Sequence, residues 1–230
     1  MNKPYGRKTK KKVGEILHDS CRETALERLE LIPDEQLVGH LFSYFYNTDE
    51  LIKFRSITAM GALGSRIEKK NMEKARIVLR RIMWNLNDES GGIGWGSPEA
   101  MGEILCKSPE LALEFKSILF SYLHPDGNFI EHEALQRGVL WGVGTFLKSD
   151  PHSLSKRAKG VLFGYLHSPD PIKRGYAVRA LKNADCFDCS LVPEEIMNDT
   201  HKLNIFIDWS FTATRISDLV LSCEGRKIFA

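Results

Sequence analysis

The residues with the most chemical potential lie in one glycine-rich stretch. Residues 85–98 read Asn-Leu-Asn-Asp-Glu-Ser-Gly-Gly-Ile-Gly-Trp-Gly-Ser-Pro, with four glycines around Trp95. Asn87, Asp88 and Glu89 can offer oxygens to a hard cation, but the spacing of a calcium loop is absent. The Lys and Ser/Thr that complete a phosphate-binding P-loop are missing, and no strand precedes the glycines as a dinucleotide-binding fingerprint requires. We therefore expect neither a metal nor a cofactor.

Trp95 is the part of this stretch best suited to contact a ligand. Glycines permit positive φ and so favour an irregular loop, and Ser97 followed by Pro98 is typical of a helix start immediately after it. Binding residues are often carried on loops of this kind. Trp95 can equally fold back as a plug near Trp141, with Asp88 exposed beside it. The two interpretations do not exclude each other.

Two further clusters have spacings that resemble ligand sets. Cys186 and Cys189 form a CxxC pair, but a structural zinc site needs a second pair of ligands and a thioredoxin-like site needs a preceding strand. We interpret them as ordinary loop thiols. His132 lies between two glutamates, and we interpret this run as a solvated first turn of a helix, where acids favour the helix dipole.

Arg137 and Trp141 lie one helical turn apart and can share a surface. Arginine and aromatic residues are the usual anchors of interfaces, and together they can also hold a flipped or single-stranded base. Alternatively, Trp141 packs in the core and Arg137 pairs with a nearby glutamate. The candidate ligand- or partner-binding residues are Trp84, Asn87, Asp88, Glu89, Trp95, Glu99, His132, Arg137 and Trp141. None of them is assigned a catalytic role.

A repeat of about 40 residues must position these side chains. Four segments each combine an apolar helix, a turn with an aspartate, and a second helix with a small residue inside. The turn acids are 39, 38 and 44 residues apart, and the small residues are 41, 40 and 38 apart. Glycine costs about 1 kcal/mol relative to alanine inside a helix, so glycines at matching places indicate close approach of a neighbouring helix. The acids are Asp49, Asp88, Asp126 and Asp170, and the small residues are Gly61, Gly102, Gly142 and Ala180.

The second helix of the last repeat carries the clearest family pattern. Residues 174–181 read Arg-Gly-Tyr-Ala-Val-Arg-Ala-Leu, which resembles the Arg-x-x-Ala-x-x-Ala-Leu helix of HEAT-repeat proteins, especially those of the phycobilin-lyase type. The resemblance covers residues 34–184. It implies an all-α, HEAT- or armadillo-like superhelical solenoid of antiparallel helix pairs, with the second helices lining the concave face.

Two narrower resemblances concern individual motifs. The stretch WNLNDESGGIGWG resembles a bacterial family of HEAT-repeat proteins that is itself uncharacterised. Deoxyhypusine hydroxylases, which are also HEAT proteins, bind two irons through repeated His-Glu pairs. Here the pair occurs once, at His132, so that resemblance does not extend to iron.

Charge and patterning divide the chain into three segments. Six of the 32 basic residues precede the first acid, Glu15, so residues 1–12 form a basic tail, while the rest of the chain is mildly acidic. The tail has no apolar periodicity, and we expect it to be disordered. Residues 13–184 are expected to form the solenoid, with N-terminal cap helices and four repeats. Residues 185–230 are expected to form a C-terminal cap, in which 204–216 predict a small β-hairpin.

The composition favours a cytoplasmic protein. No run approaches the ~18 apolar residues of a membrane span, and we expect no membrane partner. The five cysteines are odd in number, which suits a reducing compartment.

Three classes of function follow from these observations. The leading one is a non-enzymatic scaffold that binds a protein or peptide on its concave face and at the rim loop around Trp95. The alternative is a nucleic-acid-binding protein related to HEAT-like alkyl-base DNA glycosylases, with weak phosphate contacts through the basic tail. An enzyme or chromophore lyase rests on the resemblance alone, because no nucleophile–base pair is visible in the sequence.

Overall fold

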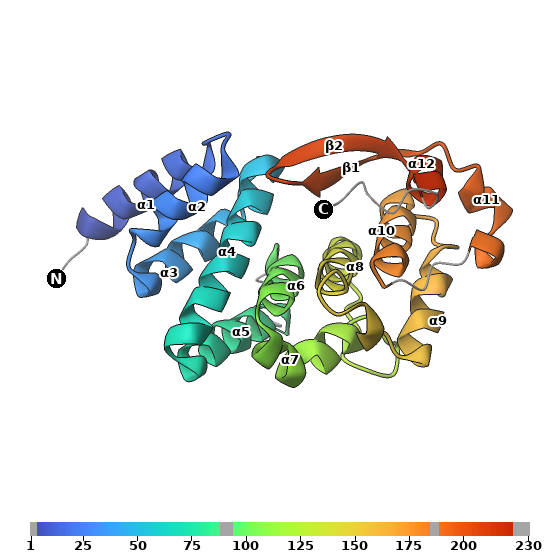
Figure 1. Ribbon diagram of the computed structural model, residues 1–230, viewed down its shortest axis with the longest axis horizontal. Coiled ribbons are helices and arrows are strands. Elements are labelled where there is room, and N and C mark those ends of the chain that lie inside the picture. The colour runs from blue at the N-terminus through green and yellow to red at the C-terminus, as the bar shows by residue number, and fades with distance from the viewer. Residues whose placement is uncertain (1–3, 88–93, 185–188, 223–230) are drawn as a thin grey trace.

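The computed structural model describes residues 4–87, 94–184 and 189–222 (Figure 1). Over these ranges the chain is predominantly helical, with one small antiparallel hairpin, so the predicted all-α fold with a hairpin near its C-terminus is confirmed. None of the described helices is long and apolar enough to cross a membrane. The helices are α1 (Pro4–Leu17), α2 (Arg22–Glu30), α3 (Asp34–Tyr44), α4 (Glu50–Lys70), α5 (Met72–Leu86), α6 (Ser97–Lys107), α7 (Pro109–Ser121), α8 (Glu133–Phe146), α9 (Lys156–Tyr165), α10 (Pro171–Asn183), α11 (Glu194–Met197) and α12 (Ile216–Leu221).

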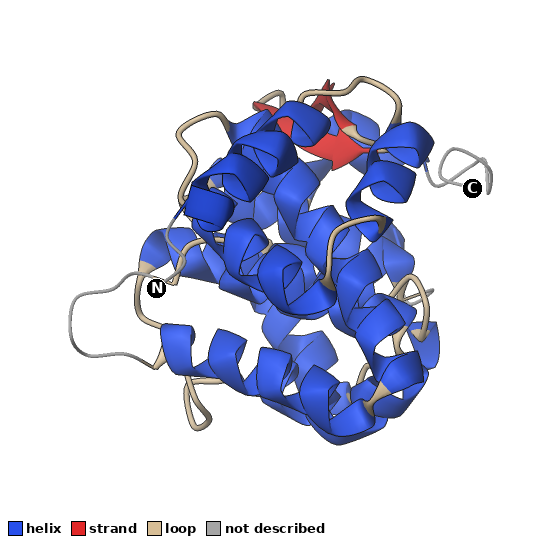
Figure 2. Cartoon of the chain, turned by 90° about the vertical axis from the view of Figure 1, so that its left-hand side faces the viewer, coloured by secondary structure: helices blue, strands red, loops and turns tan. Residues whose placement is uncertain are grey.

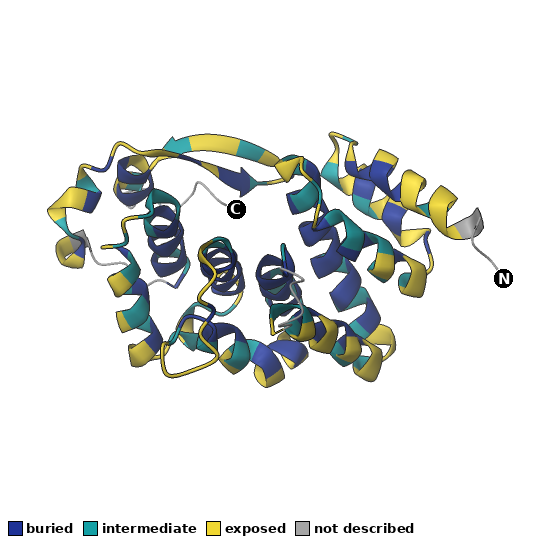
Figure 3. Cartoon of the chain, turned by 180° about the vertical axis from the view of Figure 1, so that it is seen from behind, coloured by how far each residue is buried: buried dark blue, intermediate teal, exposed yellow. Residues whose placement is uncertain are grey.

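Four helix pairs follow one another along a curve: α3 with α4, α5 with α6, α7 with α8, and α9 with α10. The second members of the pairs pack side by side in the order α4, α6, α8, α10, and these are the most extensive contacts between helices. Figure 3 shows that α6 and α8 are buried over most of their surface, whereas the first helices have one exposed side. The core therefore lies along the row of second helices.

The glycines of the repeat allow this row to pack closely. A Cβ added at Gly102 would collide with the backbone of Gly142, and one added at Gly142 would collide with the carbonyl oxygen of Pro98. At Gly61 it would lie 2.9 Å from the carbonyl oxygen of Glu103. The close helix approach predicted from these positions is confirmed.

The hairpin closes the open side of the curve. Strand β1 (Lys202–Ile207) pairs with β2 (Ser210–Arg215) across a two-residue turn in which Asp208 and Trp209 have positive φ, as a type I′ turn requires. In Figure 1 the hairpin lies across the helices from the α10–α12 end to the α1–α4 end, and Figure 2 shows it along one edge of the helices. There Trp209 Nε1 donates to the carbonyl oxygen of Asp19 at 2.8 Å, and Arg55 Nε donates to that of Trp209 at 2.9 Å.

Of the basic tail over residues 1–12 that the sequence predicts to be disordered, the part from Pro4 onward belongs to helix α1 in the structure, and residues 1–3 lie outside the described residues. The C-terminal half of α1 supplies the anchor: Val13, Ile16 and Leu17 are fully buried. The Tyr44 hydroxyl also donates to the carbonyl oxygen of Lys10 at 2.9 Å. Helix growth from an existing turn is far more favourable than nucleation, so the helix extends into the polar residues.

Candidate functional site

The first turns of α4 and α6 and the N-terminal end of α8 meet around Trp95. The Trp95 and His132 rings contact each other edge to face, with centroids 5.5 Å apart. The Lys53 ammonium lies 5.9 Å from the centre of the Trp95 ring. Trp95 is half-buried and His132 is exposed. We call Lys53, Trp95, Glu99 and His132 the rim cluster.

A left-handed glycine places Trp95 in this cluster. Gly96, the N-cap of α6, has a φ of 72°, and a Cβ there would lie 2.9 Å from the Cβ of Phe45. Only glycine fits such a conformation and such a contact without strain. The loop therefore turns sharply into α6 and leaves the Trp95 ring against His132 of the next helix pair.

Glu99 lies in the first turn of α6 and is buried, with 6% of its surface exposed. Its Oε2 atom has no hydrogen-bond partner. The carboxyl group packs over Gly138 of α8, where a Cβ would lie 2.7 Å from Oε2. Burial raises the pKa of Glu99, and the positive charge of Lys53 offsets only part of that effect. Among the described residues, this buried carboxyl group accepts a hydrogen bond from its own backbone N–H but has no ion-pair partner within 4 Å.

Trp141, one helical turn after Gly138 on α8, lies in the core and is 2% exposed. Its ring contacts Phe54 of α4 and Tyr176 of α10, both with centroids 5.2 Å away. The Arg179 guanidinium stacks 3.8 Å from the ring centre and donates to the Trp141 carbonyl oxygen at 3.0 Å. Burial lowers the pKa of Arg179 to about 10. The Trp141 Nε1 atom, like Glu99 Oε2, has no hydrogen-bond partner.

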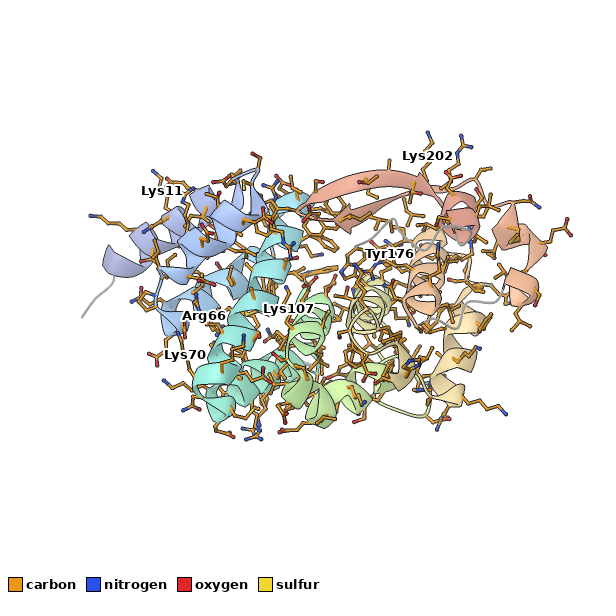
Figure 4. The ribbon with its side chains drawn as sticks, in the orientation of Figure 1. Lys11, Arg66, Lys70, Lys107, Tyr176 and Lys202 are labelled. Carbon is orange, nitrogen blue, oxygen red and sulfur yellow. The ribbon has the colours of Figure 1, made fainter. Side chains whose placement is uncertain are left out.

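Tyr176 connects these groups to the inner side of the curve. It projects from α10 (Figure 4), and burial raises the pKa of its hydroxyl. The charges that act on this hydroxyl include those of Arg179 and Glu99. Phe54 of α4, Trp141 of α8 and Tyr176 of α10 therefore form one aromatic cluster, and Glu99 is close enough to act on its Tyr176 hydroxyl.

The remaining predicted residues lie elsewhere. Arg137 Nε donates to Asp170 Oδ2 at 2.6 Å and so joins α8 to the N-terminus of α10. Trp84 is 74% exposed on α5, and Asn87, the C-cap of that helix, is exposed as well. Asp88 and Glu89 lie outside the described residues.

The structure thus brings Trp95 and His132 into contact and packs Glu99 on Gly138, whereas Trp141 lies in the core and Trp84 is exposed. Sequence reasoning missed Lys53, Phe54 and Tyr176, which complete the surroundings. Gly138 carried the one available signal, because it is a glycine inside a helix next to a predicted site residue. In the described part of the chain, no group of three or more His, Cys, Asp and Glu residues is arranged to hold a metal ion.

A second polar cluster is centred on Asp199, at a pocket of about 410 Å³ between α9, α10 and α11. Arg174 Nε donates to Asp199 Oδ2 at 2.9 Å, and the His201 ring lies 2.7 Å from Oδ1. Burial would raise the pKa of Asp199, but hydrogen bonds from the His201 backbone and from Arg174 outweigh it and lower that pKa. This cluster fastens α10 to the segment that leads into β1.

The chain is similar to proteins whose descriptions name no activity. No family model matches the chain. The chain is 31% identical over 111 residues to an uncharacterised protein of Archaeoglobus fulgidus, which covers 48% of this chain and 54% of that protein. The chain thus matches about half the length of this relative. Among solved structures, an engineered protein matches 83% of both chains with 16% identity and a TM-score of 0.44.

Proposed function

We propose that the chain is a non-enzymatic interaction module that docks a protein or peptide segment on the rim cluster. The observation that carries this proposal is the half-buried Trp95, with exposed His132 at its edge and Lys53 over its face. Half-exposed aromatic side chains next to a charge are typical anchors of protein interfaces. Residues from three consecutive second helices share the cluster, so a docked segment contacts several repeats at once.

The proposed docking surface is the rim rather than the whole concave face. Phe206 and Phe211 of the hairpin pack on Phe54, with ring centroids 5.4 and 5.2 Å away, and Phe54 packs on Trp141. These contacts occupy the inner surface with the chain's own side chains. The rim cluster lies at the N-terminal ends of the second helices, where Lys53 precedes Phe54 and Arg55, the residues of α4 that contact the hairpin.

The same proposal assigns the stacked pairs to the HEAT-repeat class and the protein to the cytoplasm. The repeat period of about 40 residues and the row of second helices with glycines at its contacts support the class. The odd number of cysteines, five, favours a reducing compartment.

The test is affinity capture with three variants under identical conditions. Trp95→Ala and His132→Ala should each lose the proteins that the wild type captures. Leu113→Ala is the matched control, because Leu113 is an apolar side chain that is 71% exposed on α7, and it should retain them. Melting temperatures of all variants separate lost binding from lost folding. Equal recovery of the same proteins by a folded Trp95→Ala variant would contradict the proposal.

A second candidate function is weak nucleic-acid contact through α1. Arg7, Lys8, Lys11 and Lys12 are exposed on this helix, and Lys11 pairs only with exposed Glu15, at 3.9 Å. Such cations bind phosphates non-specifically and lose affinity steeply with salt. A variant with Lys8, Lys11 and Lys12 replaced by Gln should lose DNA binding at low salt, while Trp95→Ala should retain it. Unchanged binding by the triple variant would exclude α1 as the contact.

A further inference from the structure

Glu99 is buried in a way that folding alone does not explain. Buried polar groups in folded proteins nearly always have hydrogen-bond partners, and an exception calls for a specific cause. Glu99 Oε2 has none. The other buried side-chain atoms without partners belong to neutral hydroxyls and rings or to Arg66, which forms an ion pair with Asp34 at 2.7 Å. Among the described residues, Glu99 is thus the buried carboxyl group left unsatisfied.

The fold makes room for this carboxyl group. Gly138 faces it across the α6–α8 contact, and any side chain at that position would collide with both carboxyl oxygens. An apolar residue of similar volume at position 99 would fill the same space without burying a carboxyl group, and such replacements are often neutral or stabilising. The α6–α8 contact instead combines a charged residue with the glycine that accommodates it.

The charges around Glu99 leave a place for one more cation. From α4, Lys53 and Glu50 act on it with opposite signs, and Tyr176 of α10 is the other titratable neighbour. The Lys53 ammonium does not form an ion pair with Glu99; it lies over the rings of Phe54 and Trp95, 5.8 and 5.9 Å from their centres. Two acids, Glu50 and Glu99, therefore lie near one lysine, whose ammonium is held over two aromatic rings.

From this arrangement, and resting on the function proposed above, we propose that Glu99 binds an arginine side chain of the docked segment. A guanidinium group is planar, stacks on aromatic rings, and donates two parallel hydrogen bonds to one carboxylate. It would satisfy Glu99 Oε2 and lie against Trp95, which is open to solvent.

Binding of the cation carries a proton balance. Burial raises the pKa of Glu99, so at a given pH the free protein holds a larger protonated fraction of this carboxyl than it would if the group were exposed. When the guanidinium enters, the carboxyl O–H bond breaks and the proton passes to the buffer. The carboxylate that results accepts the guanidinium N–H groups, and no other reactant is required.

The experiment is calorimetric titration with two capped peptides, acetyl-Gly-Arg-Gly-amide and its citrulline counterpart. Citrulline has nearly the same shape as arginine but no charge. We expect the arginine peptide to bind the wild type at least ~10-fold more tightly than the citrulline peptide does. The free energy of a close charge pair in an interface exceeds the free energy that corresponds to a tenfold change in affinity. Its binding enthalpy should also differ between buffers of different ionisation enthalpy, because a proton is released.

Two variants complete the design. Glu99→Gln, which preserves shape, should lose both the preference for arginine and the buffer dependence. Lys53→Met should bind the arginine peptide more tightly, because a like charge is removed. No binding of the arginine peptide to the wild type, or equal binding of both peptides, would overturn the proposal, as would an unchanged preference in Glu99→Gln. A lysine peptide that binds as tightly as the arginine peptide would overturn the choice of guanidinium.

The outcome is separable from that of the proposed function. If Trp95→Ala loses the captured proteins while Glu99→Gln captures them like the wild type, the rim cluster docks a partner but Glu99 does not bind an arginine side chain of that partner. If capture is independent of Trp95 but the peptide results hold, Glu99 binds cations and the docking surface lies elsewhere.

Discussion

Glu99 and Asp199 are carboxyl groups of nearly equal burial with opposite electrostatic environments. They are 6% and 7% exposed. Asp199 receives hydrogen bonds from Arg174 and His201, and its pKa is lowered, whereas Glu99 has an unpartnered oxygen and a raised pKa. The fold thus supplies hydrogen-bond donors to both carboxyl oxygens of Asp199 but leaves one carboxyl oxygen of Glu99 without a donor. The first arrangement stabilises structure; the second is open to a ligand.

The largest effect is expected when the Asp199 carboxyl is removed. Asp199→Asn should cost about 3 kcal/mol, because breaking a buried ion pair leaves Arg174 without its counter-ion. Asp199 has a lowered pKa in the folded state. Its stabilising contribution is therefore present above the unfolded pKa and is lost as pH falls through the folded value. Urea unfolding at pH 7 and at a pH well below 3.8, the ordinary value from which the pKa of Asp199 is lowered, should show wild type and variant converging at the lower pH. Parallel curves at both pH values would contradict a structural role.

The next effect concerns the space beside Glu99. Gly138→Ala should destabilise by roughly 1–3 kcal/mol, as overpacking does, because its Cβ meets the carboxyl oxygens. Gly160→Ala is the matched control: Gly160 lies inside α9 with nothing within 4 Å of an added Cβ, and alanine should stabilise there by about 0.5 kcal/mol. A double variant of Glu99→Ala and Gly138→Ala should be less destabilised than the sum of its parts. Strict additivity would show that the two residues do not share this contact.

A smaller effect of opposite sign is expected at Glu99 itself. Glu99→Gln should raise the free energy of unfolding by on the order of 1 kcal/mol at pH 8, because it removes the cost of ionising a buried carboxyl. A raised folded-state pKa contributes stability below the unfolded pKa and loses it as pH rises through the folded value. The advantage of the variant should therefore shrink between pH 8 and pH 5. A variant that is less stable than the wild type at pH 8 would mean that Glu99 has a partner in solution.

The smallest effect is expected on the outer face. Trp84→Ala should change stability by no more than about 0.5 kcal/mol, because the side chain is 74% exposed on α5. Denaturant unfolding is the measurement. A loss of several kcal/mol would contradict the exposed position of Trp84 on α5.

The repeat was predictable because its signal is local. The period of the turn acids and of the small residues gives the helix pairs, and the packing of Gly102 on Gly142 follows from the cost of glycine in a helix. The hairpin turn was also visible as a break between two short apolar runs. Each of these features depends on residues close together in the sequence.

The closure of the molecule and the state of Glu99 depend on contacts that local patterns do not encode. Trp209 donates a hydrogen bond to Asp19, which is 190 residues away in the sequence. The sequence around either residue gives no signal for this contact. Glu99 follows Ser97-Pro98 in a typical helix start, a position where acids are usually solvated. Its burial arises from Gly138 and Lys53, which belong to different repeats. The helical form of α1 was missed because its anchor, Val13 to Leu17, lies beyond the basic residues.

The most direct test of the account is carbon-13 NMR of the Glu99 side-chain carboxyl, assigned by comparison with Glu99→Gln. Because burial raises the pKa of Glu99, we predict that in the free protein Glu99 titrates at higher pH than Asp199. On saturation with acetyl-Gly-Arg-Gly-amide, the resonance should move to the position of an ionised carboxylate at a pH where the free carboxyl is still protonated. A Glu99 resonance that titrates with the exposed glutamates, or that does not move when the peptide is added, would contradict it.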